Sequence, residues 1–291
     1  MNFEQRAIRF PCEGASLYGV VSVPETTAAR GVLVVVGGPQ YRSGSHRQFM
    51  LLACDLAARG VTVMRFDYRG MGDSEGEPRT FEDVGDDIGA AIDRFFVEVP
   101  AMKEVVIWGL CDAASAALFY AHRDSRVRGL VLLNPWVRTD EGIAKAYLKH
   151  YYLSRLLEPD LWKKILSGRF EYRAAAQSVV GMCAKVLQRG RPQVNTGDAA
   201  ARDRVGAHST LPERMLQGLE QFKGKVLLIM SGNDLTAKEF LDLVSGSRKW
   251  KKLLGAPNVQ RRDLAEANHT FAQRDWRNQV TSWTNDWIVS W

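Results

Sequence analysis

The chain has 291 residues, 46% of them hydrophobic and 25% charged, which is typical of a soluble globular protein. It contains no run of about 18 apolar residues, which excludes a transmembrane helix, and its N-terminus, MNFEQRAIRFPCEG, has no apolar signal-peptide core. The net charge of +6 is scattered over short pairs such as Lys163-Lys164 rather than gathered on one basic helix. We therefore expect a cytoplasmic protein with no nucleic-acid partner.

Short runs of β-forming apolar residues recur along the chain. The first two alternate between apolar and polar residues and predict an antiparallel hairpin at a sheet edge. The later runs are mostly continuous, as in parallel strands that are covered on both faces. The eight predicted strands lie at about 5–10, 16–23, 31–36, 61–66, 104–108, 129–133, 225–230 and 259–264.

Helical patterns separate these strands. Residues 46–59 form one such pattern, and Gly60 is a suitable residue to end it. Thr80 is a candidate N-cap for a second helix, in which apolar residues recur at three- and four-residue spacing up to Val99. The alternation predicts an α/β fold with a doubly wound, mostly parallel, eight-stranded sheet.

The alternation stops between residues 137 and 216, where no strand is predicted. This stretch has amphipathic helical pieces followed by a polar segment, 195–210, with too few apolar residues to pack. We expect a helical cap over residues 137–216 and a core made of residues 1–136 and 217–291. The aromatic residues of the cap and of the tail SWTNDWIVSW are interpreted as buried faces; membrane-surface contact is the alternative, which a liposome pelleting assay tests.

The stretch VVIWGLCDAASAALFYA, residues 105–121, predicts a buried strand, a sharp turn and a helix, with Cys111 at the turn. A nucleophile at such a turn needs small residues two positions away on either side, because the backbone is tightly packed there. Gly109 and Ala113 meet this need. Cys111 is therefore the candidate nucleophile, and the start of the helix favours its thiolate form.

The partners of such a nucleophile come later in the chain, the acid first and the histidine second. Asp234 follows the predicted strand 225–230, and His269 lies on the loop after the last strand. We predict a Cys111–His269–Asp234 triad, with Asp140 as the alternative acid.

An acyl-transfer site also needs an oxyanion hole made of two backbone N–H groups. Asp112, directly after the nucleophile, supplies one candidate. The loop after the third strand reads Gly37-Gly38-Pro39-Gln40, and because proline has no N–H, Gln40 is the second candidate. Gly38, Tyr41 and Trp136 are the candidate substrate-binding residues.

The glycine-rich stretch Asp67–Gly76, DYRGMGDSEG, lacks the spacing of a phosphate-binding loop. We interpret it as structural, with Asp67 and Arg69 holding the loop beneath the site. The four cysteines are widely spaced and form no metal-binding pattern, so we expect reduced thiols and no metal or cofactor.

Taken together, GGPQ, DYRGMGDSEG, GLCDAA, GND and NHTF resemble the motifs of the α/β-hydrolase superfamily. The elbow GLCDAASAA and the segment GGPQYRSGSHRQF are more narrowly similar to the type 1 exosortase-system-associated hydrolases, which occur in Gram-negative bacteria beside exopolysaccharide and exosortase loci. Cysteine elbows also resemble those of dienelactone hydrolases and polyhydroxyalkanoate synthases. These resemblances imply a bacterial cytoplasmic hydrolase and leave its substrate open.

Our leading hypothesis is a hydrolase that acts on a small ester or thioester through an acyl-cysteine intermediate. Because the acyl-enzyme is a reactive thioester, an acyltransferase with the same intermediate is the second hypothesis. A non-catalytic binding module that kept the fold is the third.

Overall fold

The structure is a computed structural model that describes residues 2–38, 40–138 and 209–291. Nearly all of these residues belong to one compact unit, Met1–Val137 with Leu211–Trp291. The predicted cap falls almost entirely outside the described residues and stays a prediction. Its expected end at residue 216 lies within helix α7 (Leu211–Gln221).

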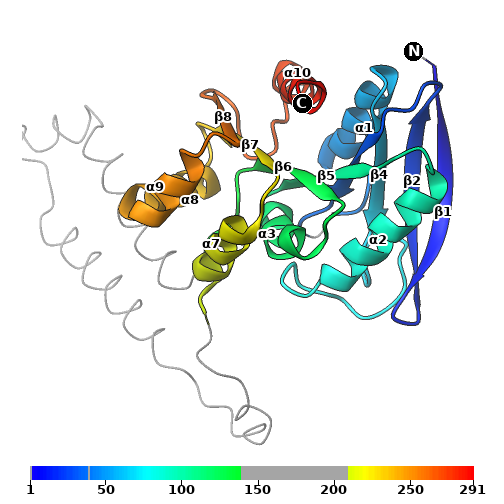
Figure 1. Cartoon of the computed structure of the whole chain (residues 1–291), viewed down its shortest axis with the longest axis horizontal. Helices are drawn as coiled ribbons and strands as arrows, with labels where there is room; N and C mark the ends of the chain where they lie inside the picture. Colours follow the sequence, from blue (N-terminus) through cyan, green and yellow to red (C-terminus); the bar gives the residue numbers. More distant parts are fainter. Residues whose placement is uncertain (1, 39, 139–208) are drawn as a thin grey trace, which may run out of the picture. The chain divides into compact units, whose positions relative to one another are not determined.

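The core of this unit is one eight-stranded sheet in the order β1-β2-β4-β3-β5-β6-β7-β8 (Figure 1). The β1–β2 and β2–β4 pairs are antiparallel and every other pair is parallel. All eight predicted strands and the edge hairpin are confirmed. The strands are β1 (Phe3–Cys12), β2 (Ala15–Pro24), β3 (Arg30–Val35), β4 (Thr62–Asp67), β5 (Glu104–Leu110), β6 (Val127–Leu133), β7 (Lys225–Ser231) and β8 (Val259–Leu264).

Burial accounts for the largely apolar central strands. Every residue of β4 is buried, including Arg65 and Asp67, and so is all of β7 except Lys225, because these strands are covered on both faces. β8 ends the sheet, and its four central residues, 260–263 (QRRD), are exposed. Charged side chains on such an edge discourage pairing with another chain.

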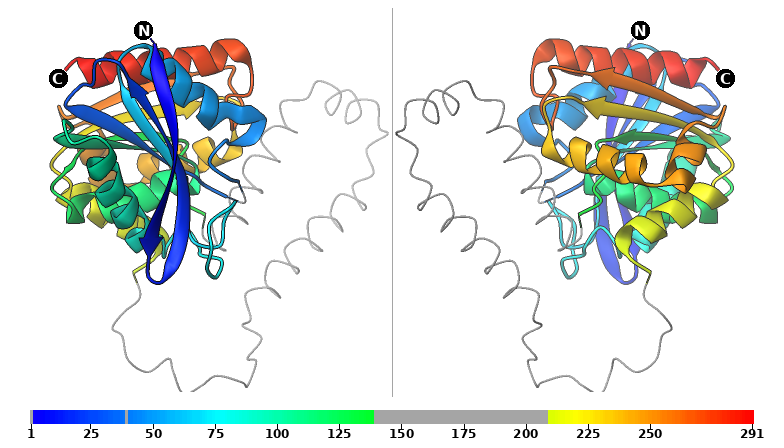
Figure 2. Two further views of the ribbon diagram at one scale, coloured as in Figure 1. Left: turned by 90° about the vertical axis from the view of Figure 1, so that its right-hand side faces the viewer. Right: turned by 90° about the vertical axis from the view of Figure 1, so that its left-hand side faces the viewer.

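Helices cover both faces of the sheet, as Figure 2 shows. Helices α1 (Gln48–Ala58) and α10 (Arg274–Val289) pack on one face through residues such as Phe49 and Trp287. The other face carries side chains such as Ile88 and Phe240, and its helices are α2 (Gly85–Glu98), α3 (Asp112–Tyr120), α7, α8 (Leu235–Gly246) and α9 (Arg248–Leu254). Two short 3-10 helices are η1 (Ser45–Arg47) and η2 (Ala121–Arg123).

One helix end follows the sequence pattern and one does not. Gly60 has φ 92° and follows the last turn of α1, as predicted. Thr80, however, does not cap α2: it lies in a turn that its carbonyl closes with the amide of Asp83, and α2 begins only at Gly85. A tertiary contact explains the later start, because Asp87 in the first turn of α2 is fully buried and accepts hydrogen bonds from the backbone and guanidinium of Arg69.

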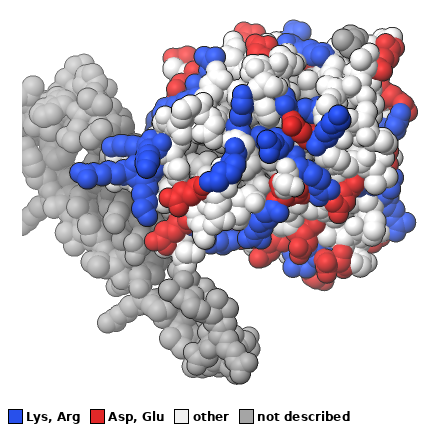
Figure 3. Space-filling model, viewed as in Figure 1, with Lys and Arg blue, Asp and Glu red and all other residues white. Residues whose placement is uncertain are grey.

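Within the described residues, no helix has both the length and the apolar character that a membrane span requires. On the face drawn in Figure 3, Lys and Arg side chains are interspersed with Asp and Glu over the described part of the chain. This agrees with the scattered charge of the sequence.

Candidate active site

Cys111 lies between β5 and α3 with φ 64° and ψ −124°. A residue other than glycine rarely adopts this conformation, and the surrounding structure must hold it there. The amide of Cys111 donates to the carbonyl of Leu133 (2.8 Å), and its own carbonyl accepts from Ala114 (3.1 Å). A β-carbon on Gly109 would lie 2.6 Å from the backbone of Ala113, so the elbow needs glycine at this position, as the spacing predicted.

Asp234 follows β7 and His269 follows β8, so both lie at the carboxyl-terminal ends of the parallel strands, where their side chains meet. His269 Nδ1 lies 2.9 Å from Asp234 Oδ2. Asp234 is buried and also caps α8, since its carboxylate accepts from the amides of Thr236 and Ala237. The cap fixes the carboxylate, and the carboxylate in turn orients the imidazole.

The protonation of this pair follows from its contacts. The hydrogen bond to Asp234 and then the one to Cys111 raise the pKa of His269 to about 10, although partial burial opposes the shift. Burial also opposes ionisation of Asp234, but the hydrogen bond and charge of His269 and the two capping amides hold its pKa below the ordinary value. The imidazole of His269 thus interacts with both the Asp234 carboxylate and the Cys111 side chain.

The loop after β3 packs directly against the start of α3. Asp112 Oδ2 accepts from the amide of Gly38 (2.8 Å), and Asp112 Oδ1 accepts from that of Ala113 (2.9 Å). A β-carbon on Gly37 would lie 2.1 Å from Asp112 Oδ1, so only glycine fits there. Burial raises the pKa of Asp112, and the amides that it accepts from limit the rise.

The amide of Gln40 donates to the carbonyl of Gly38 (2.8 Å). Its predicted role in the oxyanion hole therefore requires this contact to open. The Gln40 side chain accepts from the amide of Ser45 (3.0 Å), which anchors the loop on η1. Of the predicted substrate-binding residues, Tyr41 is 51% exposed, and the amide of Trp136 donates to the carbonyl of Cys111 (3.2 Å).

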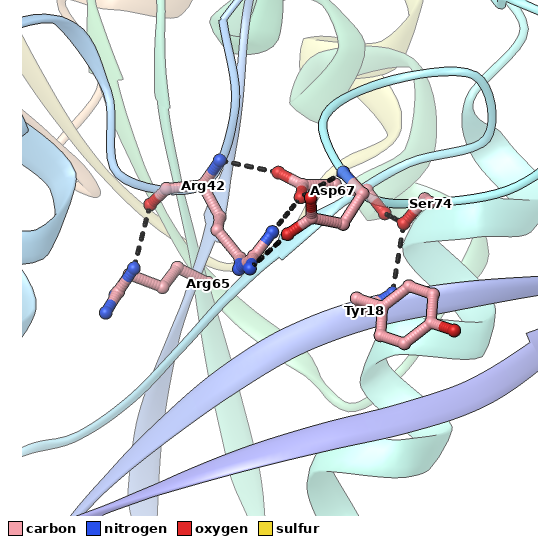
Figure 4. A network of polar contacts seen from close by, with 6 residues as sticks. Tyr18, Arg42, Arg65, Asp67 and Ser74 are labelled. Carbon is pink, nitrogen blue, oxygen red and sulfur yellow. Dashed lines mark hydrogen bonds and ion pairs between the residues drawn. The ribbon is translucent and has the colours of Figure 1, made fainter.

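A polar network holds the far end of this loop (Figure 4). Asp67 is buried and accepts from the backbone (2.5 Å) and the guanidinium of Arg42. Ser74 donates to the carbonyl of Asp67 (2.6 Å) and accepts from the amide of Tyr18, and Arg65 donates to the carbonyl of Arg42. The expectation that Asp67 and Arg69 are structural is confirmed, since Asp67 ties the DYRGMGDSEG stretch to the loop after β3 and Arg69 ties it to α2.

Asn134, which directly follows β6, is a further buried residue beside the site that was not predicted from the sequence. It is fully buried with φ 43°, and its Nδ2 donates to Ser231 Oγ (2.8 Å) and to the carbonyl of His269 (3.1 Å). Its Oδ1 accepts from the amide of Ser231 (2.9 Å). The available signal was a polar residue at the carboxyl end of a buried strand, next to a proline.

Asp140, the alternative acid, and Cys183 lie outside the described residues. Cys12, Cys54 and Cys111 are free thiols. The described ranges contain no group of three or more His, Cys, Asp or Glu side chains arranged to hold a metal ion.

Comparison with known proteins gives the family and the fold of the chain. Residues 27–269 match the family described as Hydrolase_4, serine aminopeptidase, S33. Among curated relatives, an acyltransferase named drtE from Aspergillus calidoustus is 29% identical over 136 residues, 45% of this chain and 43% of the relative. A polyketide transferase named claH from Penicillium crustosum is 25% identical over 133 residues, 44% of this chain and 43% of the relative. The chain thus spans less than half the length of these relatives.

Solved structures show the same fold. The esterase PF2001 of Pyrococcus furiosus superposes with a TM-score of 0.64 at 17% identity, over 99% of this chain and 92% of that one. Est1E of Butyrivibrio proteoclasticus, solved with bound ferulic acid, superposes with a TM-score of 0.60 at 13% identity, over 97% of this chain and 98% of that one. At these identities the likeness establishes the α/β-hydrolase fold.

Proposed function

The chain belongs to the serine aminopeptidase S33 family of α/β-hydrolase enzymes, and on this basis we propose that it cleaves an ester or thioester through a covalent acyl-cysteine. The observation that carries the proposal is the elbow itself. Cys111 occupies the strained turn before α3, its side chain interacts with that of His269, and Asp234 binds and orients the imidazole.

The proposed reaction has two steps. Cys111 Sγ attacks the acyl carbon, a carbon–sulfur bond forms, and the bond to the leaving alcohol or thiol breaks as His269 gives that group its proton. In the second step His269 takes a proton from water and the hydroxide attacks the thioester. The carbon–sulfur bond then breaks with its electron pair returning to Cys111 Sγ, and the free acid leaves while His269 keeps the proton. Asp234 stays ionised and holds the imidazole in place throughout.

Backbone amides stabilise the negative charge that develops on the substrate oxygen. The amide of Asp112 is the first proposed donor because it starts α3, where the helix dipole favours an anion. The loop after β3 supplies the second, which we assign to Gln40 once its amide leaves the carbonyl of Gly38. Gly38, Tyr41 and Trp136 are the proposed contacts to the substrate.

Intact-protein mass tests the proposal. After incubation with short p-nitrophenyl esters and acyl thioesters, the wild type should gain the mass of one acyl group, and the Cys111→Ala variant should not. Cys12→Ala is the matched control, because burial raises the pKa of the Cys12 thiol to about 11 and keeps it neutral. His269→Ala should slow both formation and loss of the adduct. An adduct that persists in Cys111→Ala refutes the assigned nucleophile.

Acyl transfer is the second candidate function, because the curated relatives named above are an acyltransferase and a polyketide transferase. An acyl-cysteine is a thioester and can pass its acyl group to an alcohol or amine as well as to water. Product analysis with and without a panel of alcohols and amines separates the two. If the free acid is the sole product in every mixture, the protein is a hydrolase. The narrower resemblance of the elbow further suggests a role beside bacterial exopolysaccharide or exosortase systems.

A further inference from the structure

The side chain of Asp112 reaches the loop on which the proposed oxyanion hole depends. Asp112 Oδ2 accepts from the Gly38 amide at 2.8 Å, and no residue with a β-carbon fits at Gly37 beside Asp112 Oδ1. These are the points of close approach between the nucleophile helix and the loop. A main-chain role for Asp112 requires no particular side chain, so these contacts need a separate explanation.

From this juxtaposition we propose that Asp112 is a positioning residue that sets the spacing of the two oxyanion donors. Its own backbone N–H is the first donor, and its carboxylate holds the loop that carries the second. The inference rests on the proposed function, since it concerns the hole that this function requires.

The opposite end of the loop is fixed independently. Arg42 is bound through its backbone and its guanidinium by the buried carboxylate of Asp67, which belongs to the end of β4 rather than to the nucleophile helix (Figure 4). Between the two anchors lie Gln40, whose side chain accepts from Ser45, and Tyr41, which is exposed. If the Asp112 contact is lost, the Arg42 anchor still holds the loop near the sheet. The loop end beside Cys111, however, is no longer held at a fixed distance from α3.

A positioning role for the Asp112 side chain and an electrostatic role predict opposite effects of removing it. A carboxylate next to the hole repels a developing oxyanion, so its charge alone opposes catalysis. If Asp112 acts by positioning, removing the side chain should slow the reaction. The neutral Asp112→Asn variant should retain much of the rate, because its amide oxygen can still accept from Gly38.

The test compares Asp112→Ala and Asp112→Asn with the wild type on one ester that forms the adduct. Loss of an oxyanion donor lowers kcat by about 100- to 1,000-fold when the donor is removed outright. Because the Asp112→Ala change only displaces the donor, we expect kcat to fall by about 10- to 100-fold with KM within about threefold, and Asp112→Asn to recover most of the loss. Asp124→Ala is the matched control. It also removes a carboxylate that accepts several hydrogen bonds, from Arg126 and Tyr120, but beyond the other end of α3.

Amide hydrogen exchange in the peptide that covers residues 37–42 gives a readout that needs no turnover. Exchange should be faster in Asp112→Ala than in the wild type and in Asp124→Ala, with near-wild-type protection in Asp112→Asn. Unchanged exchange and unchanged kcat in Asp112→Ala overturn the proposal, as does a kcat that rises. If the wild type forms no adduct with any substrate, the proposed function fails, but the exchange experiment still decides whether Asp112 holds the loop.

Discussion

Replacing Asn134 by Ala removes buried hydrogen bonds that join the end of β6 to the end of β7 and to the loop after β8. Asn134 makes three side-chain hydrogen bonds, two to Ser231 and one to the carbonyl of His269. Both Asn134 and Ser231 are almost completely buried, so water cannot replace these bonds. The variant is therefore expected to lose stability and also to loosen the loop that carries the proposed base.

The expected loss of unfolding free energy can be estimated from the hydrogen-bonding groups that lose their partners in Asn134→Ala. The buried amide of Ser231 without an acceptor costs about 1–3 kcal/mol, and the two hydrogen bonds donated by Nδ2 contribute about 0.5–1.5 kcal/mol each. An alanine at φ 43° adds about 1–2 kcal/mol of backbone strain. Together these contributions predict that the free energy of unfolding falls by about 3–8 kcal/mol, measured by urea denaturation of both proteins.

Two further variants separate the causes. Asn134→Gly should recover the part that comes from backbone strain, because glycine adopts positive φ freely. Asn258→Ala is the matched control, since it removes one exposed hydrogen bond, Nδ2 to the carbonyl of Gly224 (2.8 Å), at the opposite end of the sheet. It should cost less than about 1.5 kcal/mol. If Asn134→Ala costs no more than Asn258→Ala, the assigned role of Asn134 is wrong.

Three other predictions concern Gly109, the His269–Asp234 pair and Arg69. Gly109→Ala should abolish folding or adduct formation, since its β-carbon meets backbone at 2.6 Å, whereas Gly85→Ala, with open space around it, should leave both intact; circular dichroism and mass spectrometry check this. The stability that the His269–Asp234 pair contributes should be lost as pH rises through about 10, where the raised pKa of His269 lies, and again in acid as pH falls through the lowered pKa of Asp234. Arg69→Met should lower the free energy of unfolding by about 3–5 kcal/mol, measured in urea, because it leaves a buried carboxylate unpaired.

For each of these three predictions, a specific result would contradict the reasoning. Equal behaviour of Gly109→Ala and Gly85→Ala would falsify the steric argument for the elbow. The pH effect is measured as the stability difference between wild type and His269→Gln; a difference that does not shrink above pH 10 contradicts the pairing. For Arg69, the control is Arg261→Met, an exposed pair on β8 that should change stability by less than about 1 kcal/mol.

Local sequence patterns were sufficient to predict the sheet and the order of the candidate triad. A strand that is covered on both faces is mostly apolar, so β3 to β7 could be predicted from nearly continuous apolar runs, although β4 also buries Arg65 and Asp67. The sharp turn could be predicted because it requires small residues two positions before and after Cys111. Asp234 and His269 could be found because parallel strands bring their carboxyl ends to one edge.

Contacts between distant residues account for what the sequence analysis overlooked. Asn134 binds partners 97 and 135 residues away, and Asp112 binds Gly38 across 74 residues. A local pattern does not reveal the partner in either contact. Asn134 is marked only as a polar residue after a buried strand, and Asp112 looks like an ordinary residue at the start of a helix. The start of α2 was predicted wrongly for the same reason.

The sequence by itself thus determined the α/β class, the eight strands and the sharp turn at Cys111, since those depend on neighbours within a few residues. Only the tertiary structure decided which side chains hold the His269 loop and the loop after β3. A hydrogen bond between buried groups depends on where the folded chain brings its donors and acceptors, and spacing along the sequence does not encode that position.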